Sequence, residues 1–526
     1  MHLKRRSLRQ TGARRGERGF TMLLALGVLT LTSVLLGGAY IAVLNDTGLS
    51  RNDLNQKRAL AAAQAGIQAY NYNLNQNVNY WELCLPASNS TPVTVPGSTD
   101  AGVSETYLLK PLIAQTAPSG TTQCSTTNPI GTMIEGAGAG AAAGTFRIAS
   151  TGTSGNVSRT IVAQYRSPSF LNYVYYTDYE TLDPSATPGN PTDCAVHYPN
   201  RGSDCLSIQF VTGDSIKGPL HSEDTLLVCG SAVFGRTSAD QIEAPAHSNE
   251  GNQGCTDSAQ MVGTFNSSAP ALLPPSTDAQ ILNVTTSAFH FTGVTTIVLS
   301  GAQMSVNGGA YVNDPSNGVV YVSTSATLGC SVTYTPFDPS YSGNAGCGNV
   351  SVSGNYSVPL TIASDNDIII NGNLTPTGIT LGANPTGTAM LGLIANDFVR
   401  VYHPVSGTRG PSSGSCNDPN NNNSPNVTNA TGSLTSPYIY AAILAVNHSF
   451  IVDNYDCGAT LGTLHVFGVI AQLFRGPVGT SGNSGYLKDY NYDDRLATTE
   501  PPYFLNPVSA HWTVSRQTEC DVAASC

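Results

Sequence analysis

The residues best suited to chemistry in this 526-residue chain begin with a histidine surrounded by acids. His221 lies near Asp214, Glu223 and Asp224. An imidazole beside carboxylates can hold a metal ion or transfer protons. The short β-type runs around it favour a simpler role, in which His221 stabilises a turn. The nine histidines contain no HExxH or HxxxH pair, so the sequence predicts no metal site of that type.

Two further motifs imitate catalytic or cofactor-binding sequences. Ser412 lies in GPSSG (410–414), which matches the GxSxG pattern of serine nucleophiles, but a Pro- and Asn-rich stretch surrounds it instead of a strand–turn–helix unit. The run GAGAGAAAG (136–144) resembles a dinucleotide-binding loop, yet it follows no clear strand and precedes no helix. We therefore predict no catalytic residue and no cofactor, and we expect that the chain is not an enzyme.

Two groups of aspartates could offer oxygen ligands to calcium. They are Asp365 with Asp367, and Asp489 with Asp493 and Asp494. No EF-hand or nonapeptide pattern accompanies them, and turns closed by aspartate side chains explain them equally well. The sequence leaves calcium binding open and predicts no other metal.

Cysteines form the largest set of reactive side chains. None precedes the apolar N-terminal segment, and none has CxxC spacing, so we expect disulfides in an exported region rather than zinc ligands. Connectivity does not follow from spacing, but pairing neighbours in order would close one local loop per pair. Those pairs would be Cys84–Cys124, Cys194–Cys205, Cys229–Cys255, Cys330–Cys347, Cys416–Cys457 and Cys520–Cys526.

The charge balance argues against nucleic acid as the main partner. The chain has 23 basic and 34 acidic residues, giving a formal charge of −11. Seven bases and one acid lie in residues 1–19, so the remainder has 23 − 7 = 16 bases, 34 − 1 = 33 acids and a charge of −17. An acidic exterior disfavours contact with a phosphate backbone. We expect no nucleic-acid partner.

The elements that would position these residues are mostly short strands. After an amphipathic segment, residues 81–166 suggest a small head with a hairpin formed by 145–150 and 159–165. Residues 167–480 alternate short β-rich runs with Gly, Asn and Asp, which predicts a β-helix or solenoid, with a β-sandwich as the alternative. Residues 481–526 are expected to be a tail that packs on this β domain. The predicted fold class is α+β.

The N-terminal segment has a distinctive order of features. Seven Lys/Arg precede Gly19, and the next 25 residues, Phe20 to Leu44, carry no charge. At ~1.5 Å per residue this run reaches ~37 Å, enough to cross a bilayer core of ~30 Å. Apolar residues continue at helical spacing through 52–80, so we predict one long helix over 20–80. The basic flank predicts a cytoplasmic start and an exported C-terminus.

This segment resembles the type IV pilin and pseudopilin family in its leader (1–19), its Gly19-Phe20-Thr21 junction and the stretch KRALAAAQAGIQ (57–68). The resemblance implies cleavage after Gly19 by prepilin peptidase, methylation of Phe20, and helices packed in a filament core. Family members usually carry Glu at the fifth mature position, where this chain has Leu24. A leucine there is similar to the minor pseudopilin at a filament tip.

Two classes of function remain. The first is a minor pilin or pseudopilin, a structural protein that carries a disulfide-linked extracellular β domain for assembly initiation or adhesion. The resemblance implies other pilin subunits, prepilin peptidase and the inner membrane as partners, with a surface or glycan ligand as a further option. The second is a membrane-anchored exported protein that binds or cleaves carbohydrate. Pilus and type II secretion system remain equally open.

Overall fold

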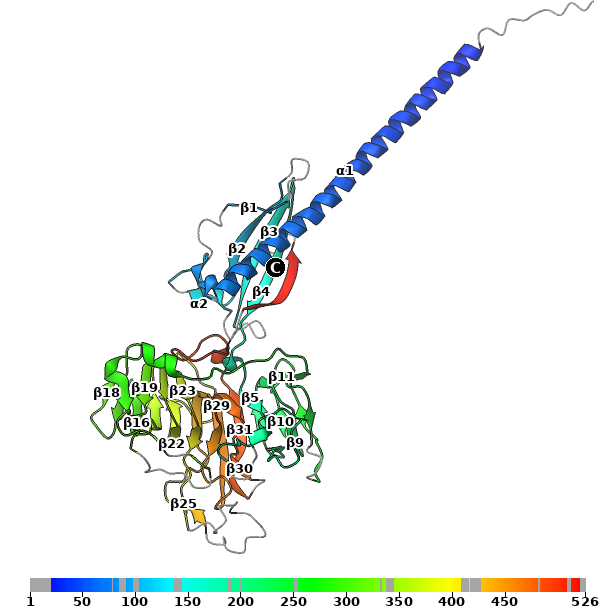
Figure 1. Cartoon of the computed structure of the whole chain (residues 1–526). Coiled ribbons are helices and arrows are strands. Elements are labelled where there is room, and N and C mark those ends of the chain that lie inside the picture. Colours follow the sequence, from blue (N-terminus) through cyan, green and yellow to red (C-terminus); the bar gives the residue numbers. More distant parts are fainter. Residues whose placement is uncertain are drawn as a thin grey trace, which may run out of the picture.

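The structure is a computed structural model that describes residues 20–77, 79–84, 91–97, 104–127, 129–135, 144–187, 192–198, 200–249, 254–331, 334–336, 345–407, 416, 427–480, 483–508 and 512–520. A long helix leads into a small sheet, and a larger β domain lies beyond that sheet (Figure 1). The chain is therefore an N-terminal apolar helix followed by mostly β structure, an α+β arrangement.

Helix α1 (Phe20–Gln76) is a single helix of 57 residues. Its segment Thr21–Val43 has a mean hydropathy of 2.1 and is long and apolar enough to cross a membrane, a property that signal sequences share. None of this segment is buried by the rest of the chain. The C-terminal half of α1 differs, because Ala59, Ala63, Ile67 and Tyr70 are buried against the sheet. The helix ends at Gln76, before the Tyr80 expected from the sequence.

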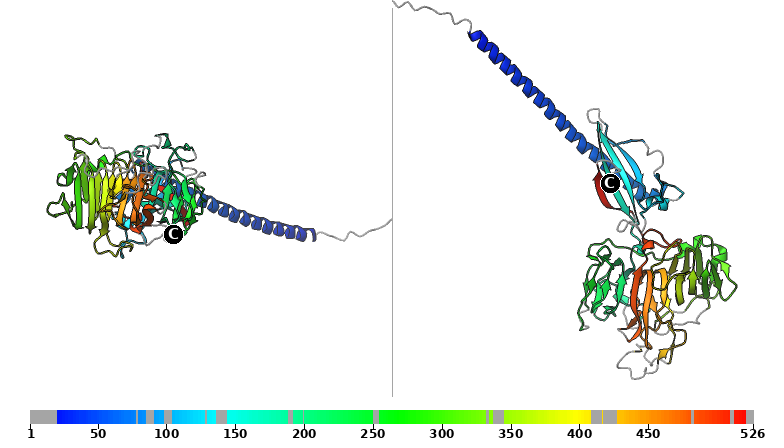
Figure 2. Two further views of the ribbon diagram at one scale, coloured as in Figure 1. Left: turned by 90° about the horizontal axis from the view of Figure 1, so that it is seen from below. Right: turned by 180° about the vertical axis from the view of Figure 1, so that it is seen from behind.

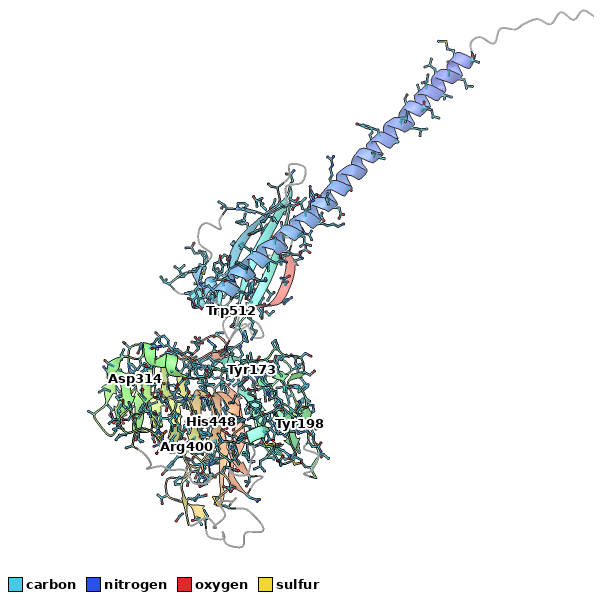
Figure 3. All side chains as sticks on the ribbon, viewed as in Figure 1. Tyr173, Tyr198, Asp314, Arg400, His448 and Trp512 are labelled. Atoms are coloured by element: carbon cyan, nitrogen blue, oxygen red, sulfur yellow. A yellow bond between two sulfur atoms is a disulfide. The ribbon has the colours of Figure 1, made fainter. Side chains whose placement is uncertain are left out.

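The head sheet has the order β1-β2-β3-β4-β32, and every pairing in it is antiparallel. Its core joins α1 to the inner face through Tyr70, Phe146 and Tyr165, with Trp81 and Trp512 at one end. Figure 3 labels Trp512 at the end of the head that lies next to the β domain. The elements are η1 (Tyr80–Leu83), β1 (Val93–Thr94), β2 (Thr106–Leu112), α2 (Pro129–Met133), β3 (Thr145–Ser154), β4 (Val157–Arg166) and β32 (Thr513–Cys520).

The expectation that the whole segment 481–526 packs on the β domain is wrong for strand β32. Residues 513–520 instead pair with β4, so everything between β4 and β32 is inserted into the head sheet. The physical reason is the free edge of β4, whose backbone N–H and C=O groups would otherwise lack partners. The part of the tail up to Val508 does lie on the β domain, where Val508 bridges to Leu273.

The inserted domain begins with a first block, residues 175–266, of parallel ladders. One ladder is β5-β8-β11-β14, a second is β7-β10-β13 and a third is β6-β9-β12. The strands are β5 (Tyr175–Tyr179), β6 (Phe210–Val211), β7 (Ser215–Lys217), β8 (Leu220–Ser222), β9 (Leu226–Cys229), β10 (Val233–Phe234), β11 (Gln241–Glu243), β12 (His247–Ser248), β13 (Gln260–Met261) and β14 (Thr264–Asn266). Short 3-10 turns η4 (Phe170–Asn172) and η5 (Thr192–Cys194) flank β5.

A second block, residues 290–492, forms longer parallel ladders in the sheet that also contains the first two ladders of the first block, whereas β6, β9 and β12 form a sheet of their own. One runs β15-β19-β21-β23-β27-β29-β31 and another β16-β20-β22-β24-β28. Its parallel strands are β15 (His290–Thr292), β16 (Thr295–Gly301), β19 (Val319–Ser323), β20 (Val350–Tyr356), β21 (Leu360–Ser364), β22 (Ile368–Pro376), β23 (Leu391–Ala395), β24 (Val399–Val401), β27 (Tyr438–Ala445), β28 (Phe450–Val452), β29 (Thr460–Phe474) and β31 (Ser484–Tyr492).

Antiparallel pairs close the edges of the second block. Strands β17 (Gln303–Val306) and β18 (Val312–Asn313) fold back from β16 at its outer end. Strands β25 (Val405–Ser406) and β26 (Thr428–Asn429) form a separate pair, and β30 (Gly479–Thr480) pairs with β31. Turns η6 (Ala279–Val284) and η7 (Ser287–Phe289) lie in the connection between the blocks, and η8 (Asp494–Ala497) follows β31.

The two blocks meet in the middle of the domain. Strand β29 pairs with β5, and β31 pairs with β7. The chain thus enters at the centre, builds the first block outward, crosses to the far end of the second block and returns to the centre (Figure 2). Entry and exit lie side by side, which allows both to connect to the head sheet. One apolar core of buried Val, Ile, Leu and aromatic side chains runs through both blocks.

Candidate functional site

Charged side chains that are far apart in sequence lie close together at the junction of the two blocks. Five ion pairs join residues of the first block, or of the segments between its strands, to the C-terminal part of the domain. They are Arg475–Glu180 at 2.8 Å, Lys488–Asp214 at 2.7 Å, Lys217–Asp489 at 2.7 Å, Arg236–Asp494 at 3.0 Å and His448–Asp183 at 2.5 Å. These contacts supplement the parallel pairing of β29 with β5 and of β31 with β7.

Two of the cations lie near one aromatic ring. The guanidinium carbon of Arg475 is 3.5 Å from the centroid of the Phe210 ring, and Nζ of Lys488 is 5.8 Å from it. Nη1 of Arg475 donates to Glu180 and to the carbonyl of Ile208, whereas its buried Nη2 has no hydrogen-bond partner. A ring face attracts cations, so Phe210 partly offsets the cost of burying both charges.

A crevice of about 470 Å³ opens beside these ion pairs. The first block contributes one wall, and the segments after β28 and β29 together with β31 contribute the other. The lining residues are Leu182, Ser207, Ile208, Gln209, Val211, Asp214, Cys229, Tyr455, Pro477, Val478, Gly479, Thr480, Tyr486, Leu487 and Lys488. The volume is typical of small-molecule sites, which span ~300–1,000 Å³.

Lys488 is the most distinctive residue of the crevice. Its side chain is 9% exposed, and its ammonium donates to Oδ2 of Asp214 at 2.7 Å. Asp214 also accepts the backbone N–H groups of Val211 and Lys488. Burial lowers the pKa of Lys488, and the neighbouring Arg475 adds to that effect against the attraction of Asp214. The carboxylate therefore holds the ammonium in a fixed position, and an ammonium has three N–H donors.

The crevice has one carboxylate, Asp214, among its lining residues. Cleavage of a glycosidic bond usually needs two carboxyl groups, one to protonate and one to attack or activate water. Asp214 accepts hydrogen bonds from the Lys488 ammonium and from two backbone amides, so these three donors already occupy its carboxylate oxygens. Asp214 is therefore the one acidic group that the described lining offers to a bound molecule.

His221, the histidine that the sequence singled out, lies outside the crevice. Its Nδ1 lies 2.8 Å from Oε2 of Glu243 and its Nε2 lies 2.8 Å from Oε1 of Glu223. The ring is buried and stacks on Tyr176. Burial opposes its charged form, but the two glutamates outweigh burial and raise the pKa of His221. The structure separates His221 from Asp214 and Asp224, which bond to Lys488 and Arg201.

The aspartates considered for calcium each contact another protein group. Asp365 accepts a hydrogen bond from the Tyr321 hydroxyl, and Asp367 pairs with buried Arg400 at 2.9 Å. Asp489, Asp493 and Asp494 pair with Lys217, Arg495 and Arg236 respectively. These contacts explain why acids occur at these positions without invoking a metal.

The described residues contain one close set of three metal-ligating side chains: Cys416, Asp456 and Cys457. Its two cysteines form a disulfide, which leaves no thiolate for a metal. The pairs Cys84–Cys124, Cys194–Cys205, Cys229–Cys255 and Cys330–Cys347 are also present. The expectation of neighbours pairing in order is confirmed for these five bonds. The sixth expected pair includes Cys526, which lies outside the described residues.

The N-terminal site residues lie at the start of α1 or before it. Helix α1 begins at Phe20, and the Leu24 side chain is 57% exposed on its surface. Gly19, Ser412 and residues 136–143 lie outside the described residues, so cleavage at Gly19 stays a prediction.

The sequence alone did not identify Arg475, Lys488 or the crevice as a site. The local sequence does hint that both cations are buried. Arg475 directly follows the apolar run LHVFGVIAQLF, and Lys488 lies between the two tyrosines of YLKDY. A long cation inside an apolar run is costly unless it has a buried partner. The partners, Glu180 and Asp214, are too distant in sequence to be recognised from the pattern alone.

Among solved structures, the chain is similar to the competence-associated pilin ComZ from Thermus thermophilus. The alignment covers 89% of this chain and 97% of that one, with 13% identical residues and a TM-score of 0.24. No family model and no curated protein matches the chain. At this TM-score the superposition of the whole chains is poor, so an assignment of function depends on the residues of the N-terminal segment and the head.

Proposed function

We propose that this chain is a minor subunit of a type IV pilin-like filament that presents the inserted β domain to the outside. The observation that supports it is α1, a single helix that begins at Phe20, exposes an apolar N-terminal half and packs its C-terminal half on an antiparallel sheet. An exposed apolar surface of this size needs a membrane or other subunits to cover it.

In this proposal prepilin peptidase cleaves after Gly19 and Phe20 becomes the methylated N-terminus. Before assembly the segment Thr21–Val43 spans the inner membrane, with the C-terminus exported. After assembly the same helix packs among those of other pilin subunits. Five disulfides fit an exported location, because such bonds persist in oxidising compartments.

We assign the inserted domain to the β-solenoid class. Parallel ladders that repeat on several sides of one apolar core support this assignment. A sandwich would consist of antiparallel sheets instead. Outward display fits this geometry, because the domain projects from the end of the head sheet through the neighbouring strands β4 and β32.

A position at the filament tip follows from Leu24. Its side chain cannot offset the charge of a neighbouring amino terminus in an apolar filament core, where an unpaired charge is costly. The inserted domain would also crowd neighbours along a shaft. Immunogold labelling of the β domain should mark filament ends, and uniform labelling of the shaft would overturn the tip position.

N-terminal sequencing of the mature protein tests the family assignment itself. The proposal expects a mature chain that starts at Phe20, and Gly19→Val should leave the precursor uncut. A mature start beyond Leu44 would identify a secretory signal and overturn the proposal. A second candidate function, a membrane-anchored carbohydrate-binding protein, is favoured by the crevice, whose single lining carboxylate suits binding.

A further inference from the structure

We infer that the crevice between the two blocks is a binding site for a neutral saccharide, with one or two sugar rings held beside Lys488. This inference deepens the display role proposed above and relies on it for its biological purpose. Binding itself is a property of the single chain.

The charges of the crevice cancel. Asp214 and Lys488 are the acidic and basic residues of its lining, and they bond to each other at 2.7 Å. An anionic ligand would meet the Asp214 carboxylate, and a cationic ligand would meet the ammonium. For neither charged ligand would the attraction to the crevice offset the free energy lost when the ligand leaves water. A neutral ligand avoids that cost.

The polar groups of the crevice both donate and accept hydrogen bonds. The lining includes the hydroxyls of Ser207 and Thr480, the amide of Gln209 and the ammonium of Lys488. A hydroxyl of a ligand can serve both roles at once, so a molecule with several hydroxyls matches this mixture. Lys488 lines the crevice with a side chain that is 9% exposed, and its bond to Asp214 fixes the position of its ammonium.

Apolar side chains separate these polar groups. Leu182, Val478 and Leu487 line the crevice together with the aromatic residues Tyr455 and Tyr486. A sugar ring has hydroxyls around its rim and C–H groups on its faces, so it presents both kinds of surface. A purely apolar ligand would gain no hydrogen bonds from the polar lining, whereas a sugar can use both kinds of surface.

The position of the crevice agrees with a binding role. It lies where two blocks meet, and ligand sites occur preferentially at such boundaries. The flanking ion pairs Arg475–Glu180 and Lys488–Asp214 fix the two walls relative to each other. A wall fixed in advance lowers the entropy lost when a ligand binds.

The test uses the full-length protein in a detergent without a sugar headgroup, titrated with maltose, cellobiose and diacetylchitobiose. Saturation-transfer NMR and calorimetry should show saturable binding of at least one disaccharide, with a Kd of about 1 mM or tighter. Absence of binding by all three sugars would overturn the inference. Tighter binding of glucose 6-phosphate than of any disaccharide would also overturn it, because that result identifies an anion site.

Ser207→Trp should fill the crevice and weaken binding by at least about tenfold. The matched control is Ser267→Trp, at an exposed position outside the lining, which should bind as the parent does. Unchanged binding by Ser207→Trp would place the sugar elsewhere and overturn the assignment. The double variant Asp214→Asn with Lys488→Met removes the ammonium without leaving an unpaired charge, and it should also lose at least about tenfold in affinity.

The sugar could belong to an insoluble polysaccharide or be free in solution, and a second measurement distinguishes these two sources. Co-sedimentation with insoluble cellulose or chitin reports attachment to a polysaccharide, whereas calorimetry with the disaccharides reports capture of free sugar. Filament assembly is scored independently. A chain that assembles but binds no sugar contradicts this inference alone, and a chain that binds sugar without assembling contradicts the proposed function alone.

Discussion

Arg475 and Glu180 are 295 residues apart in sequence, yet Nη1 of the arginine donates to Oε2 of the glutamate at 2.8 Å, with both side chains buried. The pair joins the end of β29 to the segment after β5. Because these strands belong to different blocks, the contact holds together two parts of the domain that fold from distant stretches of the chain.

Arg475→Met should strongly destabilise the β domain, because it leaves Glu180 buried without its charged partner. We expect a loss of about 3–5 kcal/mol in the free energy of unfolding, measured by denaturant titration with circular dichroism. Adding Glu180→Gln should recover most of the loss, since no unpaired charge then remains. Lys57→Met is the control: its pair with Asp53 is exposed and screened by water, so the free energy of unfolding should not change measurably.

The hydroxyl of Tyr321 lies 3.0 Å from Oδ1 of Asp278 and 2.5 Å from Oδ1 of Asp365. One hydroxyl hydrogen cannot serve both carboxylates, so a proton on Asp278 completes the contact. Burial, countered by the Tyr321 hydroxyl and supported by the charge of Asp365, raises the pKa of Asp278 to about 7. The folded state therefore binds this proton more tightly than the unfolded chain, in which the pKa is about 4.

The sign of the pH effect follows from that difference. Stability from Asp278 is fully present below pH about 4 and is lost as the pH rises through about 7. Asp278→Asn carries no charge, so relative to the parent it should gain stability between pH about 5 and 9, by up to about 4 kcal/mol. Exposed Asp193→Asn should show no such trend. An unchanged pH profile in Asp278→Asn would refute the buried proton.

Gly152 of β3 lies against α1. A Cβ added there would be 2.0 Å from the Ala59 carbonyl oxygen and 2.3 Å from the Ala63 nitrogen. Gly152→Ala should force the helix and the sheet apart and destabilise the head by about 1–3 kcal/mol. Gly37→Ala, where the added carbon meets nothing within 4 Å, should have no effect on the head.

The measurement for Gly152→Ala is tryptophan fluorescence during thermal unfolding. The two tryptophans of the chain, Trp81 and Trp512, lie in the head with ring centroids 5.6 Å apart. Fluorescence therefore reports the head, while circular dichroism is dominated by the larger β domain. If the unfolding temperature measured by circular dichroism fell while that measured by fluorescence did not, the strain would lie in the β domain, contrary to this prediction.

Peptide mapping without reductant should recover the five disulfides and a sixth bond between Cys520 and Cys526. The sixth bond would close the C-terminal end next to β32, where Cys520 is the last strand residue. Each local bond is expected to contribute about 2–4 kcal/mol by limiting the unfolded chain. A free thiol at Cys520, or its pairing with a different cysteine, would show that the rule of neighbours in order fails there.

Local patterns in the sequence determined the parts of this protein that depend on near neighbours. The uncharged run after Gly19 and the helical spacing after Asn52 predict α1, because helical hydrogen bonds connect residues four apart. The cysteine order anticipated the five observed bonds, since each closes a loop of 11 to 41 residues. The short alternating runs also predict strands, whose side-chain period is two.

Tertiary structure alone decided which distant strands meet. Nothing in the local pattern of residues 513–520 states that they return to β4, because any free strand edge offers the same backbone groups. The joining of β29 to β5 likewise depends on where the chain comes back after the second block. Arg475, Lys488 and the crevice follow from that joining: a buried cation can be recognised as part of a site once the fold has placed its carboxylate beside it.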